Sequence, residues 1–174
     1  MVDLFGLLNL VDISIISAAL GVLAGVINSI FASRRAERQR QTEIETRQAQ
    51  LFMQLMDKCT SKEGIENFRA LDRATWSSYE EWLELRRDDV EYDTAYRWIS
   101  VICNSTGALL REGLLNVRII ALVATRMIIV YWKKHEDVIH IFRERRNDRS
   151  YRVEWEYLYN TTMKYLDEHP EPAP

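Results

Sequence analysis

The hydrophobic pattern of this chain begins with a long uncharged stretch close to the N-terminus. From Ile13 to Ala32, twenty residues carry no charge, and the polar run RRAERQR follows almost at once. A helix of that length rises about 30 Å, which matches the hydrocarbon thickness of a bilayer. Asp12 would cost roughly 2.5–3.5 kcal/mol near the membrane centre, so we expect the span to begin after it. The pattern therefore predicts an N-terminal segment and transmembrane anchor over residues 1–33.

The charges on either side of this stretch predict its orientation. All 23 Lys and Arg residues lie at position 34 or later, and only Asp3 and Asp12 are charged before it. The positive-inside rule then puts the N-terminus outside and the C-terminal domain in the cytoplasm. A cleaved signal peptide would need a positively charged start, which MVDLFGLLNLVD lacks. We therefore expect a single-pass protein of the cell (inner or plasma) membrane, with membrane lipid contacted at its surface by Arg34, Arg35, Arg38 and Arg40.

A stripe of small residues runs along the predicted anchor. Ser17, Gly21, Gly25 and Ser29 recur every four residues, and GVLAG is a full G-x-x-x-G motif. Small side chains let two membrane helices approach closely, so the stripe is predicted to be a packing face. The alternative is that glycine is simply frequent in membrane helices. The partner would be another copy of the chain or a helix of a larger membrane protein complex.

The rest of the chain divides by its apolar periodicity. Residues 34–50 are polar on every side and are predicted to form a helical neck. Apolar positions at helical spacing resume at Leu51, which predicts a cytoplasmic helical domain over 51–168, followed by a disordered tail over 169–174. Only six Gly and three Pro occur, and all three Pro lie in the last five residues. We therefore predict an all-α fold in which the neck leads into a bundle of about five to six helices.

Several local signals predict where the helices of the domain begin and end. Thr60 with Glu63, and Ser77 with Glu80 or Ser78 with Glu81, have the spacing of capping boxes. A longer helix is expected from about Asp93 to a stop at Gly113.

The next predicted helix starts after Asn116 and continues to residue 146. Its first sixteen residues are hydrophobic enough to suggest a second membrane span, but they contain Arg118 and Arg126 and are too short to cross a bilayer. A helix of the core is the favoured interpretation. The last helix is expected over residues 149–166.

Composition limits the possible functions of the domain. Residues 34–174 hold all 23 basic residues and 24 of the 26 acidic ones, a near-neutral balance that argues against nucleic-acid binding. Cys59 and Cys103 form no C-x-x-C motif and are expected to be reduced, packed thiols.

The candidates for catalysis are few. Glu136, His140 and Glu144 share a helix face and could hold a metal if another helix supplied ligands. His135 and His140 are five apart, unlike the two histidines of H-E-x-x-H, and a solvated polar stripe is the favoured interpretation. The sequence thus assigns no catalytic, cofactor-binding or metal-binding residue and no small-molecule substrate, and we expect no enzyme.

A cluster of arginines near the C-terminus could bind phosphate groups or a partner. Its members are Arg143, Arg145, Arg146, Arg149 and Arg152. Acidic residues are interleaved with them, and a second acidic run lies over Glu80–Asp93. Internal Arg–carboxylate pairs between the last two long helices and this acidic run are therefore the favoured interpretation.

Several short motifs together resemble a known family. They are ETRQAQLFMQLMDK, the W-x-x-Y-x-x-W cluster at Trp76–Trp82, N-x-x-G-x-L-x-x-x-G at Asn104–Gly113, Trp132, FRERRND and EWEYLYN. With the membrane helix they resemble a prokaryotic domain-of-unknown-function family of small single-pass helical proteins, over roughly residues 42–166. The resemblance implies no activity, cofactor or catalytic residue. Some loosely similar membrane proteins are described as phage abortive infection proteins.

The favoured hypothesis is a non-catalytic, membrane-anchored interaction module. It would assemble with itself, or serve as an accessory or scaffold subunit of a membrane complex. One alternative is a membrane-tethered sensor or effector in phage defence. The other is a metal-dependent hydrolase that uses Glu136, His140 and Glu144.

Overall fold

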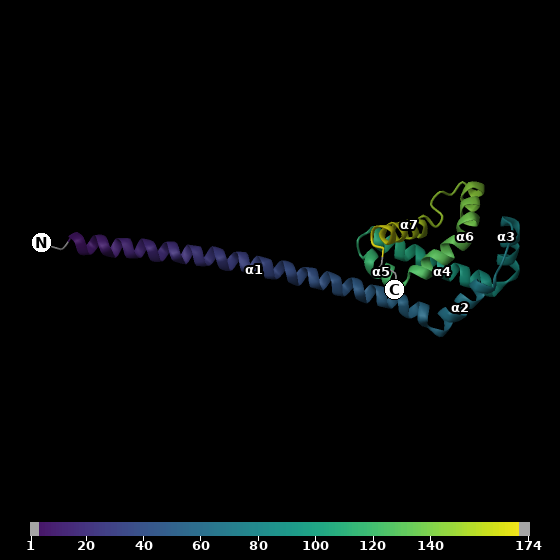
Figure 1. The fold of residues 1–174 in the computed structure, drawn as a ribbon, viewed down its shortest axis with the longest axis horizontal. Coiled ribbons are helices and arrows are strands. Elements are labelled where there is room, and N and C mark those ends of the chain that lie inside the picture. The colour runs from purple at the N-terminus through teal and green to yellow at the C-terminus, as the bar shows by residue number, and fades with distance from the viewer. Residues whose placement is uncertain (1–3, 171–174) are drawn as a thin grey trace. The chain divides into compact units, whose positions relative to one another are not determined.

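A computed structural model describes residues 4–170, and it describes residues 4–24 and Ile27 by their backbone alone. Within residues 4–170 the chain forms seven helices and no strand, which confirms the all-α prediction (Figure 1). The helices are α1 (Leu4–Thr60), α2 (Lys62–Arg73), α3 (Tyr79–Asp88), α4 (Val90–Arg111), α5 (Val117–Val123), α6 (Thr125–Arg146) and α7 (Val153–Glu168).

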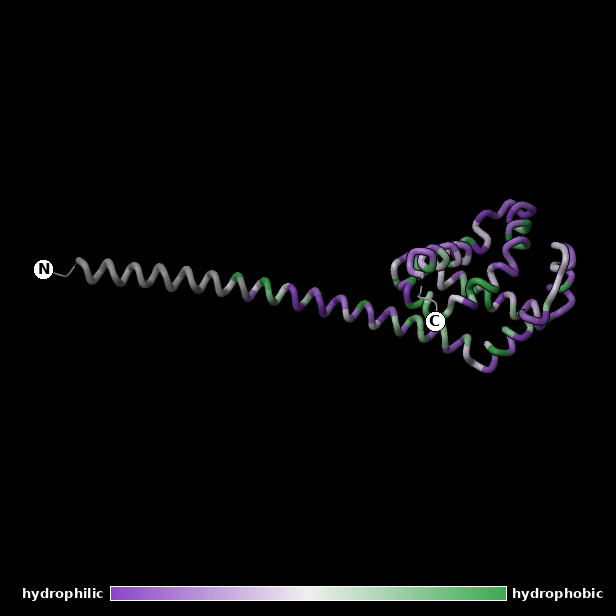
Figure 2. The backbone as a smooth tube through the Cα atoms, in the orientation of Figure 1, coloured by the Kyte–Doolittle hydropathy of each residue, from purple (hydrophilic) through white to green (hydrophobic). Residues whose placement is uncertain are grey.

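The chain divides into two compact units, with the boundary between Thr46 and Arg47 inside α1. In unit 1, every side chain described from Gly25 onward is exposed. Figure 2 shows that the described part of α1 in this unit is hydrophobic at first and then hydrophilic. Where side chains are described, no helix carries an apolar stretch long enough to cross a bilayer. Most of the predicted span, Ile13–Ala32, lies outside those residues.

Unit 2, which begins at Arg47, is built around α4. This helix packs against α2, α3 and α7, while α5 and α6 also pack against α7 (Figure 1). Large aromatic side chains fill much of the core, because each removes a large apolar area from water. The fully buried ones are Trp82, Trp155, Tyr92 and Tyr96. Phe52 and Cys59, from the last turns of α1, are also buried, so the end of α1 belongs to this core.

Side-chain caps start four of the helices of unit 2. The Ser78 hydroxyl accepts a hydrogen bond from the Glu81 N–H and the Asn116 side chain accepts one from the Arg118 N–H, which confirms two of the expected caps. The expected cap at Thr60 is wrong by one residue. Thr60 donates its hydroxyl to the Met56 carbonyl and stays within α1, and Ser61 caps α2 instead.

Two helix starts also differ from the expected positions. α4 begins at Val90 rather than near residue 93, because Asp89 accepts a hydrogen bond from the Tyr92 N–H. α7 begins at Val153 rather than at 149. Asn147 and Arg152 both have positive φ, 50° and 58°, and therefore bracket a loop that a helix cannot continue through.

The single helix expected over residues 117–146 is interrupted at Ala124, which separates α5 from α6. The Thr125 hydroxyl donates to the Ala121 carbonyl one turn earlier. Thr42 and Thr106 make the same bond to the carbonyl four residues earlier without interrupting their helices, so this contact accompanies the break and does not by itself explain it. The sequence pattern is apolar on both sides of this point and gives no sign of the interruption.

The N-x-x-G-x-L-x-x-x-G motif fixes how α4 meets α7. The side-chain oxygen of Asn104 accepts a hydrogen bond from the backbone N–H of Trp155 at 3.3 Å. Trp155 lies in the first turn of α7, where backbone donors have no helical partner. A Cβ on Gly107 would lie 1.9 Å from the carbonyl oxygen of Glu154, so only glycine allows this approach. Gly113, at φ 69°, ends α4 as expected.

The first prediction follows from this close approach. Gly107→Ala should lower the free energy of unfolding of unit 2 by about 1–3 kcal/mol, because α4 and α7 must separate to admit the methyl group. All five tryptophans lie in unit 2, so their fluorescence in a urea titration reports its unfolding alone. Ser105→Ala, on the exposed side of the same helix, is the control and should change stability little. Equal stability of the two variants would contradict the predicted clash.

Candidate functional site

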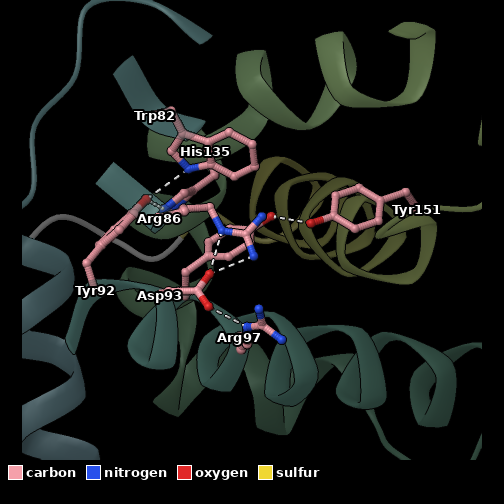
Figure 3. A network of polar contacts seen from close by, with 8 residues as sticks. Trp82, Arg86, Tyr92, Asp93, Arg97, His135 and Tyr151 are labelled. Carbon is pink, nitrogen blue, oxygen red and sulfur yellow. Dashed lines mark hydrogen bonds and ion pairs between the residues drawn. The ribbon is translucent and has the colours of Figure 1, made fainter. Parts of the chain in front are cut away.

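The candidate site is a network of polar side chains in the core of unit 2, centred on His135 of α6 (Figure 3). The His135 side chain is completely buried. Its Nε2 lies 3.2 Å from the Tyr92 hydroxyl, and its Nδ1 lies 2.8 Å from the Tyr131 carbonyl oxygen. The Trp82 indole N–H donates to the same Tyr92 hydroxyl at 3.0 Å. The network thus joins α3, α4 and α6 through side chains.

Aromatic rings surround the His135 imidazole. Ring centroids lie 5.1 Å away for Tyr96, 5.2 Å for Trp76, 5.9 Å for Trp155 and 6.5 Å for Tyr92. Such surroundings offer a charge little solvation, so burial favours the neutral imidazole. Burial lowers the pKa of His135 from 6.5 to about 4, although the hydrogen bond to Tyr131 opposes this effect.

The partners of His135 assign its protons. The Tyr131 carbonyl can only accept, so Nδ1 carries the hydrogen and Nε2 is left as the acceptor. The Tyr92 hydroxyl then donates to Nε2 and accepts from the Trp82 N–H. Both ring nitrogens of His135 are therefore engaged inside the protein. If Nε2 gained a proton, its N–H would face the O–H of Tyr92, and the hydrogen bond from Tyr92 to His135 would be lost.

A second part of the network lies around Asp93, which is half-buried. Arg86 of α3 contacts one carboxylate oxygen at 2.7 Å, and Arg97 contacts the other at 2.6 Å. The Arg86 guanidinium also lies over two rings, 4.9 Å from the centroid of Trp82 and 4.6 Å from that of Tyr96. The contacts of Arg86 with Asp93 and Tyr96 hold α3 against α4 next to the His135 network, while the Arg97 pair lies within α4.

The geometry of this site suits stabilisation better than catalysis. A general base needs a free lone pair within reach of a substrate, and a nucleophile needs a base beside it. His135 has its lone pair directed at Tyr92, and Asp93 accepts from two guanidinium groups. The arrangement can therefore fix the positions of three helices, and a substrate could reach the His135 ring only by displacing core side chains.

The structure disperses the five arginines predicted as a cluster. Arg143 pairs with Glu156 and donates to the Tyr151 carbonyl, while Arg145 pairs with Glu80 at 2.6 Å. The contact between Arg145 and Glu80 joins α6 to the first turn of α3, in the acidic run.

The three remaining arginines have different surroundings. Arg152 is partly buried, with its guanidinium 5.0 Å from the Tyr151 ring centroid, and Arg146 lies 5.9 Å from that of Phe142. Arg149 is exposed. Arg143 and Arg152 are thus partly buried, whereas Arg145, Arg146 and Arg149 are exposed, with Arg145 still paired to Glu80.

The stripe proposed as a possible metal site has other partners. Glu136 contacts Lys133 at 3.1 Å, and His140 lies 3.8 Å from Glu156. Glu144 is exposed on the last turn of α6. In the part of the chain that the structure describes, no group of three His, Cys, Asp or Glu side chains is placed to hold a metal ion.

The residues predicted to meet the membrane lie in unit 1. Arg34, Arg35, Arg38 and Arg40 are exposed, as are Gly25 and Ser29 of the small-residue stripe. Ser17 and Gly21 lie outside the residues whose side chains the structure describes.

The two cysteines lie in the core of unit 2 as free, buried thiols. Burial raises the pKa of the Cys59 thiol to about 11, and burial also raises the pKa of Cys103. Both thiols are therefore poor nucleophiles at neutral pH, because the thiolate is the reactive form.

Sequence reasoning considered His135 only against a zinc motif and Asp93 only as a helix start, and it assigned neither these residues nor Tyr92 to a buried network. His135 lies on the buried face of α6, since Tyr131 and Trp132 before it and Val138 and Ile139 after it are all buried. That periodicity was visible in the sequence. The hydrogen-bond partner of His135 on α4, Tyr92, lies 43 residues away and was not.

Comparisons with known proteins leave the resemblance as a prediction. No family model, no curated protein and no solved structure matches this chain.

The second prediction concerns pH. The pKa of His135 is 6.5 in the unfolded chain and about 4 in the folded one. Its contribution to the free energy of unfolding is therefore complete above pH 6.5 and is lost as the pH falls from 6.5 to 4. The slope should reach about 1.4 kcal/mol per pH unit. Urea titrations of wild type from neutral pH to about pH 5 measure it, above the range in which most carboxylates titrate.

Two variants test the assignment of this slope to one residue. His135→Gln should flatten it, and His140→Gln, which alters an exposed histidine on the same helix, should retain it. If the slope is unchanged in His135→Gln, another group causes the acid sensitivity.

Proposed function

We propose that this chain is a non-catalytic, membrane-anchored interaction module. Its N-terminal segment crosses the cell membrane with the N-terminus outside, and its helical domain lies in the cytoplasm. The domain assembles with itself or serves as an accessory subunit of a larger membrane complex. The observation that carries the proposal is the uncharged stretch Ile13–Ala32, followed by Arg34 and Arg35 and by no acidic residue until Glu37.

The backbone of α1 supports this proposal. It is helical from Leu4 to Thr60, so the uncharged stretch and the polar residues after it belong to one continuous helix. A helix satisfies its own backbone hydrogen bonds, which is a requirement for crossing a bilayer. The finer division of the fold is then an anchor to residue 33, a neck over 34–50 and a domain over 51–168.

The chemistry of unit 2 supports a non-catalytic role. The buried histidine has both ring nitrogens engaged, the half-buried carboxylate of Asp93 accepts from two arginines, and both thiols are buried. Buried polar groups whose partners are all inside the protein make the helical domain rigid, and its surface is then fixed. A fixed helical surface suits a protein that presents itself to a partner, because little ordering is needed on binding.

The third prediction tests the anchor. The wild-type chain should stay in the membrane fraction after alkaline extraction. Leu20→Lys combined with Leu23→Lys should release it, because each lysine costs roughly 2.5–3.5 kcal/mol near the centre of the bilayer. The same change at Leu83 and Val90, exposed positions of unit 2, is the control and should leave the chain in the membrane.

Orientation is read in the same experiment from Pro174→Cys. An impermeant thiol reagent should label this cysteine only after the cells are permeabilised. Labelling in intact cells would reverse the proposed topology, and release of the wild-type chain by alkali would refute the anchor.

The fourth prediction tests assembly through the small-residue stripe. Gly21→Leu with Gly25→Leu should prevent close approach of two helices, so the chain should elute in mild detergent as a smaller species. Membrane insertion should persist, since leucine is more hydrophobic than glycine. Leu20→Val with Leu23→Val, which changes neighbouring positions outside the stripe, is the control. An unchanged elution size for the glycine variant would place assembly in the helical domain.

A further inference from the structure

An exposed apolar and basic face lies along α5 and the start of α6. Every fourth residue from the turn before α5 is exposed, and the series alternates aliphatic with basic side chains. Its members are Leu114, Arg118, Leu122, Arg126 and Val130, with Val123 beside them. Leu122 is 64% exposed and Val123 is 59% exposed, which is unusual for adjacent aliphatic residues in a folded unit. We call this set the α5 face.

The charge around the α5 face has one sign. No acidic residue occurs between Gly113 and His135, whereas four basic residues do. Two of these have partners inside unit 2, because Lys133 contacts Glu136 and Lys134 donates to the Leu71 carbonyl. Arg118 and Arg126 make no ion pair with any residue that the structure describes. The two arginines of the face are therefore available to an external anion.

We propose that the α5 face binds the surface of an anionic lipid bilayer. Leu114, Leu122 and Val123 enter the boundary between headgroups and acyl chains, and Arg118 and Arg126 contact lipid phosphates. The proposal rests on the proposed function, since the anchor and this face belong to the same chain. The face starts beside the first turn of unit 2, where Gln48 donates to the Gly113 carbonyl at 2.9 Å.

Two observations favour lipid over protein as the occupant. The exposed apolar residues are leucine and valine, which are under-represented among the residues that dominate protein interfaces, and no aromatic residue is among them. A symmetric contact between two copies would bring the arginines of both faces together, and like charges oppose each other across an interface. A bilayer needs no matching shape and supplies the opposite charge.

The experiment uses the full chain reconstituted into vesicles of phosphatidylcholine, with or without phosphatidylglycerol. Leu122→Cys carries an environment-sensitive fluorophore, and Val101→Cys, 57% exposed on α4, is the matched control. The native thiols are buried and react slowly. With phosphatidylglycerol, the label at 122 should shift to the blue and be quenched by spin-labelled lipid, and the label at 101 should not. Arg118→Gln with Arg126→Gln should lower the ratio of lipid-bound to unbound α5 faces about thirtyfold.

Each outcome decides between the two proposals. If the protein resists alkaline extraction and the label at 122 remains in water, the α5 face does not bind lipid and the anchor stands. If alkali releases the protein but added vesicles quench the label, the anchor fails and the α5 face stands. A label that is shielded from water without quenching by lipid, and that cross-links to another chain, overturns lipid in favour of a protein partner. Unchanged tryptophan emission shows that the variants are folded.

Discussion

The need to pair both nitrogens of one buried imidazole constrains much of unit 2. His135 has no contact with solvent, so each unpaired nitrogen would cost about 1–3 kcal/mol. One nitrogen is satisfied by its own helix, through the Tyr131 carbonyl. The other requires the Tyr92 hydroxyl and therefore a fixed distance between α6 and α4. Trp82 adds α3 to the same hydrogen-bonded chain.

The constraint continues outward through charge. Tyr96, which packs on His135, also lies under the Arg86 guanidinium and hydrogen-bonds the Tyr151 hydroxyl at 2.9 Å. Arg86 in turn holds Asp93, one residue after Tyr92. Partly buried ion pairs of this kind add little net stability against an apolar alternative, because desolvation offsets their attraction. Their effect is on geometry, since these groups keep their partners only while α3, α4 and α6 hold their present positions.

Signals within one turn of helix could be predicted from sequence. So could a pairing of the late arginines with the acidic run, as Arg145 and Glu80 show, but the contacts around His135 could not. Ser78, Gly113 and Asn116 end or begin helices where expected, because capping depends on residues within three or four positions. The interruption at Ala124 falls inside a stretch that is apolar on both sides, and the sequence gives no sign of it. The contact of His135 with Tyr92 depends on packing between helices 43 residues apart in the chain. The candidate site was therefore the part least accessible to sequence reasoning.

Residues 117–132 show why hydrophobicity alone could not separate a core helix from a membrane span. The buried positions Ile120, Ala124 and Ile128 recur every four residues. Arg118 and Arg126 fall two residues out of phase with them, on the exposed side. A membrane span would surround both arginines with lipid, whereas a helix half-packed on a core leaves them in water at no such cost. The stretch before Arg34 carries no charge that could define such a phase, which is why the sequence predicts a membrane span there.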